Sequence, residues 1–119
     1  MKPSTTKLSP SEIADQLKTV PGWRVENGAI ARDYTTDGWP TTLMLVNAIG
    51  FFAEAADHHP DLAVSWGKVQ VKLSTHSAGG ITASDFELAR LIEQTALFRP
   101  HPTGSALRGT TKKFVTGGP

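Results

Sequence analysis

The amino-acid sequence predicts an α+β fold, a four-stranded antiparallel sheet with helices packed on one face. Segments with helical periodicity alternate with pairs of short strand-like segments, in the order helix, two strands, helix, two strands, helix and tail. A length of 119 residues suits one domain with one modest hydrophobic core. We therefore assign residues 1–98 to a single domain and residues 99–119 to a C-terminal tail.

The first helix is predicted over residues 9–19. Ser9 is a favourable capping residue, and Pro10 suits the first helical position. Ile13 and Leu17 are four residues apart and should share the buried face.

A β-hairpin should follow, with strands at 23–26 and 29–34. Asn27-Gly28 lies between them and tolerates the positive φ angles of a type I′ turn. Val25 and Ile30 should then lie on the same side of the hairpin.

A long helix is predicted from Thr41 to Asp57, after Pro40. Polar residues are scarce in it, so most of its surface should be buried against something as wide as a sheet. The apolar residues recur at steps of three and four: Leu43, Val46, Ile49, Phe52, Ala53 and Ala56. Pro60 ends this helix and should hold His59 in an extended conformation.

Two strands and a third helix complete the domain. Apolar residues alternate with polar ones in both strands, at Leu62, Val64 and Trp66 and, after a turn at Gly67-Lys68, at Val69, Val71 and Leu73. Thr82 to Asp85 outlines a capping box for a helix that ends near Phe98. Its buried face should hold Phe86, Ala89, Ile92 and Ala96.

Charge and composition limit the classes of function. The tail carries four basic residues and no acid, whereas residues 1–98 carry 8 basic and 11 acidic residues. The domain therefore offers no basic face for nucleic acid, and the tail is a candidate site for a protein partner. Without cysteine, thiol chemistry is excluded. The sequence shows no membrane-spanning run or signal peptide, so we expect a cytoplasmic protein.

Three of the four histidines lie between Glu54 and Asp85, at or near predicted element ends. Histidine exchanges protons near neutral pH, so this group resembles a proton-transfer site. His58 follows Glu54 by four residues, and the negative end of the helix dipole should add to the charge of Glu54 in favouring a protonated His58. An ordinary ion pair at a helix end is the alternative.

The other candidate residues also have structural explanations. His59 belongs to the kink before proline and could be a surface histidine. His76 closes the last strand, off its apolar face, where a ligand could reach it. Asp85 could orient an imidazole or only stabilise a helix N-terminus. Trp66 is most simply a core or interface residue.

A zinc site is an alternative use of these residues, because three histidines and a carboxylate could bind the metal. His58 and His59 are adjacent and should diverge, and the sequence has no H-x-H or H-x-x-x-H pair. It also has no phosphate-binding loop and no nucleophile elbow. We therefore expect proton transfer without a covalent intermediate or a metal.

These motifs resemble the pterin-4a-carbinolamine dehydratase family. The pattern is Glu54-x3-His58-His59-Pro60, Trp66, Thr75-His76 and Gly80-x-Thr82-x2-Asp85, and the similarity extends from about Leu17 to Gln94. The resemblance implies an α+β domain that forms dimers or tetramers and uses no metal or organic cofactor. It implies dehydration of 4a-hydroxytetrahydropterin to quinonoid dihydropterin, in tetrahydropterin recycling.

The resemblance also implies roles for particular residues. It places His58, His59 and His76 around the pterin. Further contacts would come from Asp57, Ser74, Thr75 and Ser77, with Glu54, Pro60, Trp66 and Asp85 in support. We expect His58 to be the acid, His76 the base and His59 a binding residue, although the acid and base labels could be exchanged. The alternative is a non-catalytic member that acts as an assembly factor or a transcriptional dimerisation cofactor.

Overall fold

The computed structural model describes residues 6–100 and 103–116. Residues 1–5 and parts of the predicted tail, at 101–102 and 117–119, lie outside this range. The described elements are α1 (Pro10–Leu17), β1 (Arg24–Glu26), β2 (Ala29–Thr36), α2 (Trp39–Ala56), β3 (Asp61–Ser65), β4 (Lys68–Leu73), the 3-10 turn η1 (His76–Ala78), α3 (Ala83–Ala96) and β5 (Val115–Thr116).

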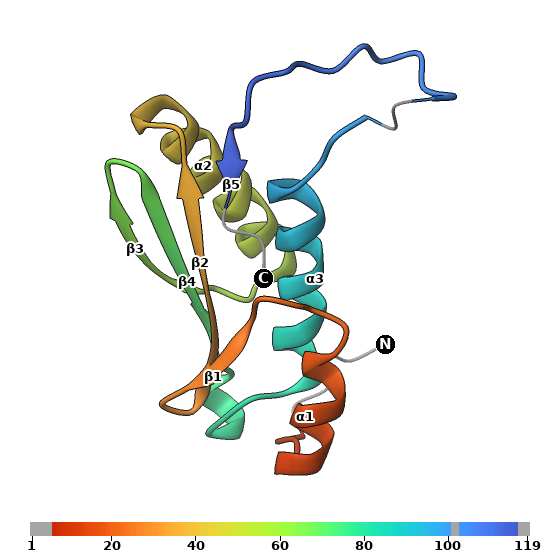
Figure 1. The fold of residues 1–119 in the computed structure, drawn as a ribbon. Helices are drawn as coiled ribbons and strands as arrows, with labels where there is room; N and C mark the ends of the chain where they lie inside the picture. The colour runs from red at the N-terminus through yellow and green to blue at the C-terminus, as the bar shows by residue number, and fades with distance from the viewer. Residues whose placement is uncertain (1–5, 101–102, 117–119) are drawn as a thin grey trace.

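The sheet has the strand order β1-β2-β4-β3, and every pairing in it is antiparallel (Figure 1). This confirms the predicted α+β fold with its four-stranded sheet. A fifth strand was not predicted. β5 pairs with Thr35 and Thr36 of β2, along the edge where β1 has already ended. The tail therefore returns to its own domain and covers part of an edge that would otherwise be unpaired.

The predicted hairpin is present, and its turn has the expected chemistry. Asn27 and Gly28 have φ angles of 51° and 78°, as a type I′ turn requires. Val25 lies opposite Ile30 in the register, so the two side chains share a face. Ile30 is fully buried, whereas Val25 is exposed at the end of the hairpin.

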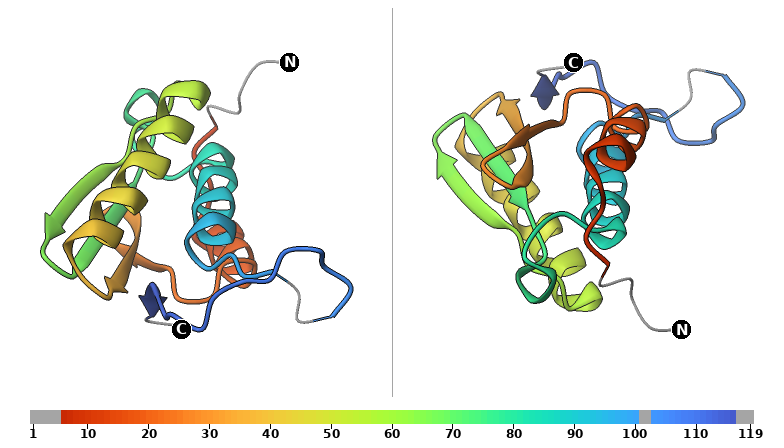
Figure 2. Two further views of the ribbon diagram at one scale, coloured as in Figure 1. Left: turned by 90° about the horizontal axis from the view of Figure 1, so that it is seen from above. Right: turned by 90° about the horizontal axis from the view of Figure 1, so that it is seen from below.

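The helices lie on one side of the sheet, with α2 and α3 next to each other (Figure 2). The predicted buried face of α3 is confirmed. The prediction for α2 is wrong at Leu43 and Ala56, which are exposed. Only a narrower stripe of α2 is buried, because α3 and the sheet contact it over one side: Thr41, Thr42, Leu45, Ile49 and Ala53.

A buried ionic cluster joins the sheet to α3. The Arg32 side chain is 2% exposed and lies 3.0 Å from a Glu93 oxygen, which also accepts hydrogen bonds from the Tyr34 hydroxyl and the Trp23 indole N–H. Burial and the contact with Glu93 raise the pKa of Tyr34, so its hydroxyl remains a donor. The cluster fixes α3, and with it the start of that helix, relative to β2.

The opposite face of the sheet is polar. Arg24 pairs with Glu26 and Asp33, Lys72 pairs with Glu26, and Lys68 pairs with Asp33. Such exposed pairs add little stability, but they make this face compatible with water. This face can therefore remain in contact with solvent.

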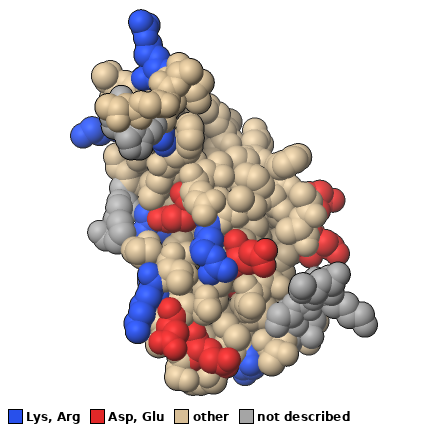
Figure 3. All heavy atoms as spheres, turned by 90° about the vertical axis from the view of Figure 1, so that its right-hand side faces the viewer, with Lys and Arg blue, Asp and Glu red and all other residues tan. Residues whose placement is uncertain are grey.

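The tail forms a loop that leaves α3, projects from the body and returns at β5 (Figure 1). In the view of Figure 3 this end of the molecule shows basic side chains and no acidic ones, whereas both kinds lie on the rest of the body. Lys112 lies 3.4 Å from the Asp37 carboxylate, and the Asp37 amide donates to the Phe114 carbonyl oxygen. These contacts attach the end of the loop to the start of α2.

Candidate functional site

The site is built where α2 ends. Asp57 caps the helix in a left-handed conformation, with φ 50° and ψ 45°. The His58 amide donates to the Ala53 carbonyl oxygen, which closes the last turn. The chain leaves the helix at this point, so His58 and the following residues no longer obey helical spacing.

His58 contacts a buried carboxylate. Its Nε2 atom lies 2.6 Å from Oδ1 of Asp85, which is fully buried at the start of α3. The His58 side chain is 17% exposed, so it can be reached from solvent. Because Nε2 faces Asp85, Nδ1 is the ring nitrogen left to face a ligand.

The other oxygen of Asp85 is held by two donors. Oδ2 accepts from the Thr82 amide and from the Thr75 hydroxyl, both at 2.9 Å. The hydrogen bond from the Thr82 amide to Asp85 is half of the predicted capping box, and this capping box is confirmed. Asp85 therefore both caps α3 and contacts His58. The cap is one of the two roles that the sequence suggested, and the contact is the geometry that the other role, orienting an imidazole, would need.

Glu54 pairs with His59 instead of His58. Its Oε1 atom lies 2.9 Å from Nε2 of His59, and both side chains are largely exposed. The expectation of a Glu54–His58 pair is therefore wrong. Because Asp57 has a left-handed backbone conformation, the chain turns after it, so that the His58 side chain contacts α3 and the His59 side chain contacts Glu54.

His76 lies in a loop tied to the same carboxylate. β4 ends at Leu73, so His76 begins η1 and does not close the strand as expected. The preceding residue, Thr75, is bonded to Asp85 through its side chain and to Gly80 through its backbone. These bonds hold the loop, with His76 and Ser77 exposed and Ser74 half-buried, close to the end of α2.

Not every predicted residue joins this group. The Trp66 carbonyl oxygen accepts from the Thr42 hydroxyl, and the Trp66 ring packs over Gly38, so Trp66 lies at the start of α2. An 18-residue helix spans about 27 Å, which separates Trp66 from His58 within one chain. The Trp66 side chain is 68% exposed. Asp57, which is exposed, and Pro60 directly flank His58 and His59 in the sequence.

The arrangement suits general acid–base chemistry. One imidazole contacts a buried carboxylate, a second, exposed one follows it in the sequence, and a third, also exposed, follows Thr75, which bonds the same carboxylate. In the described ranges no three His, Cys, Asp or Glu side chains are grouped so as to hold a metal ion.

None of the helices in the described part of the chain is long and apolar enough to span a membrane.

The hydrogen-bond network around the carboxylate was not predicted. The Thr75 hydroxyl bonds Asp85 and lies 2.8 Å from the Thr82 hydroxyl, and its expected contact with substrate stays a prediction. Thr82 was expected only as a helix cap. The capping box is the sequence feature that could have predicted this network. A carboxylate at its third helical position, here Asp85, uses one oxygen for the cap and leaves the other free for a second partner.

Comparisons with known proteins give matches that agree with one another. The family model described as pterin 4 alpha carbinolamine dehydratase matches residues 6–95. A protein of Aquifex aeolicus, provisionally named as such a dehydratase, is 48% identical over 88 residues, which are 74% of this chain and 89% of that protein. One of Nocardia farcinica with the same provisional name is 40% identical over 93 residues, covering 78% of this chain and 98% of that protein.

A solved structure shares the fold. It is a protein of Brucella melitensis described as a transcriptional coactivator/pterin dehydratase, and it superposes with a TM-score of 0.71 at 30% identity. The match covers 73% of this chain and 95% of that one. The tail, with β5, follows the last residue that the family model matches.

Proposed function

Because this chain belongs to the pterin 4 alpha carbinolamine dehydratase family, we propose that it converts 4a-hydroxytetrahydropterin to quinonoid dihydropterin and water. Such a reaction would return an oxidised pterin to a recycling pathway. It removes a hydroxyl group from carbon 4a and a proton from a neighbouring ring nitrogen. An acid and a base placed on the two sides of the scissile bond are sufficient.

We assign the acid to His58. The imidazolium would give its proton to the 4a-hydroxyl group as the carbon–oxygen bond breaks and water leaves. The Asp85 carboxylate at 2.6 Å orients the ring, so Nδ1 would be the donating atom. This replaces Glu54 as the reason for the assignment, because Glu54 pairs with His59.

His76 would be the base. It would accept the proton from the ring nitrogen while the new carbon–nitrogen double bond forms, so the protons balance. His59 and the loop at 74–77 would hold the pterin, with Asp57 at the rim.

The contact between His58 and the buried Asp85 is the observation that carries this proposal. Placing a carboxylate in a fully buried position is costly unless donors surround it. A helix cap alone needs only one of its oxygens, and the second orients an imidazole toward solvent. A protein used only as a scaffold has no need of this arrangement.

A non-catalytic binding role is the second candidate. The Brucella melitensis protein is described as a transcriptional coactivator as well as a dehydratase. The tail of this chain adds a basic segment that could bind an acidic protein partner with strong salt dependence.

Removing the tail separates the two roles. A chain ending at Phe98 should keep most of its dehydratase activity, because the three site histidines lie outside the tail. Its Tm should fall by roughly 4–8 °C if the lost edge contacts contribute about 1 kcal/mol. Under the binding role, truncation should instead abolish partner capture. A tail with its Lys and Arg residues changed to Gln separates loss of charge from loss of β5. Lost turnover in a stable, truncated protein would contradict this assignment.

We also propose that the protein is a homo-oligomer, either a dimer or a tetramer. The outer strand β3 has no further pairing partner in the described chain, and α2 exposes the large apolar side chains of Leu43 and Phe51. Light scattering at micromolar concentration should give a multiple of 12.7 kDa. Phe51→Asp should lower that mass if α2 forms the contact, and Phe98→Asp should not. A wild-type mass of one chain would refute the proposal.

A further inference from the structure

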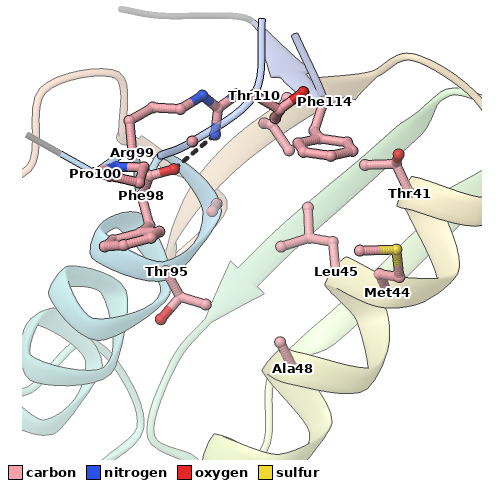
Figure 4. A pocket seen from close by; sticks show the side chains of 13 residues that line it. Thr41, Met44, Leu45, Ala48, Thr95, Phe98, Arg99, Pro100, Thr110 and Phe114 are labelled. Carbon is pink, nitrogen blue, oxygen red and sulfur yellow. Dashed lines mark hydrogen bonds between the residues drawn. The ribbon is translucent and has the colours of Figure 1, made fainter. Parts of the chain in front are cut away.

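A cavity lies toward the opposite end of α2 from the histidines. It has a volume of about 390 Å³, is open to solvent on one side, and is bounded by the first half of α2, the end of α3 and the returning tail (Figure 4). Ala48 is its lining residue nearest the histidines on α2, ten residues before His58, which corresponds to about 15 Å of helix. The cavity is therefore separate from the proposed catalytic site.

Its walls are apolar and its mouth exposes apolar groups. Leu45 and Ala96 are buried residues of the wall, Val115 of the tail also lines it, and Phe114 of the tail lies across from Leu45 (Figure 4). Met44 and Phe98 lie at its edge and are 60% and 57% exposed. A volume of this size is within the range of small-molecule sites.

The polar chemistry at the mouth is cationic. Arg99 lines the cavity, and its guanidinium donates to the Phe98 carbonyl oxygen and lies 5.8 Å from the centre of the Phe114 ring. Among the described residues, no acidic side chain lines the cavity. Lys112, over the same ring at 5.2 Å, is paired with Asp37. Arg99 has no acidic partner among residues 6–100 and 103–116, so its charge is available to an anion.

We propose that this cavity binds a small amphipathic carboxylate, with its apolar body between α2 and the tail and its carboxylate on Arg99. The apolar walls favour the body, and the guanidinium offers paired donors to a carboxylate. The lining residues from 98 onward follow the part of the chain that the family model matches, at 6–95. The site is therefore a property of this chain's tail.

Octanoate and octan-1-ol form a matched pair of probes, since they have the same chain length and differ in the carboxylate. In ¹H–¹⁵N NMR titrations of the full chain, octanoate should shift the amide signals of Leu45, Ala48, Thr110 and Val115 saturably, with a Kd on the order of 1 mM or tighter. Arg99→Gln should weaken octanoate binding about tenfold and leave octanol binding unchanged. Arg108→Gln, which removes a tail charge outside the cavity, should change neither.

Ala48→Phe should fill the cavity and abolish the binding of both probes. The proposal is overturned if the two probes bind equally, if Arg108→Gln weakens octanoate as much as Arg99→Gln, or if Ala48→Phe still binds. It is also overturned if the same signals shift with protein concentration alone while the mass rises, because a second copy of the chain then occupies the cavity. The titration reads binding, so its outcome is independent of dehydratase activity.

Discussion

Replacing His58 or His76 with alanine should lower kcat for 4a-hydroxytetrahydropterin dehydration by about 10² or more, because one positioned acid or base contributes typically 10²–10⁴-fold. Each variant removes one of the two proton transfers that the reaction requires. His59→Ala should act mainly through KM, since the His59 ring pairs with the exposed Glu54 and is assigned to binding. Steady-state kinetics of the three purified variants measure these effects.

His101→Ala is the matched control for these substitutions. It removes the fourth histidine, which the sequence places in the tail, and should leave kcat and KM unchanged. Thermal unfolding of each variant separates loss of chemistry from loss of fold. Turnover near that of the wild type in both His58→Ala and His76→Ala would refute the acid–base assignment.

Asp85→Asn should have the second largest effect, because it acts on both catalysis and stability. An amide cannot stabilise positive charge on His58, and its N–H₂ group can force the wrong tautomer, so kcat should fall by about 10². The change also weakens the cap of α3 and leaves buried donors poorly matched. We expect a loss of about 1–3 kcal/mol in the free energy of unfolding.

Glu12→Gln is the control that separates the contribution of Asp85 to catalysis from its contribution to stability. Glu12 occupies the same N3 position in the capping box of α1, where its carboxylate accepts from the Ser9 amide. It is exposed and touches no histidine among the described residues, so the variant should lose a little stability and keep full activity. If Asp85→Asn lowers Tm but leaves kcat and its pH profile unchanged, Asp85 is only a helix cap.

Local signals predicted most of the fold. The Asn27-Gly28 turn, the two helix caps and the alternation at Val69, Val71 and Leu73 depend on neighbouring residues, and the structure confirms each of them. The pairing of β5 with β2 could not be predicted in this way. It joins segments about 80 residues apart, and Val115–Thr116 is too short to show a strand pattern.

The site was predicted less completely, because the backbone conformation of Asp57 changes the directions of the histidine side chains that follow it. Spacing of four residues pairs side chains only within a continuous helix. The positive φ of Asp57 ends that helix one residue before His58, and aspartate does not signal such a cap as clearly as glycine. Glu54 therefore meets His59, and His58 meets Asp85, 27 residues away.

The most direct test of the proposed reaction is turnover of chemically generated 4a-hydroxytetrahydropterin in the presence of a metal chelator. The formation of quinonoid dihydropterin should be much faster with the wild-type protein than without it, and unchanged by chelation. The His58→Ala/His76→Ala double variant, folded and of equal mass in solution, should add little to the uncatalysed rate. A wild-type rate no faster than the uncatalysed one, or a rate abolished by the chelator, would contradict the proposal that these histidines dehydrate the pterin without a metal.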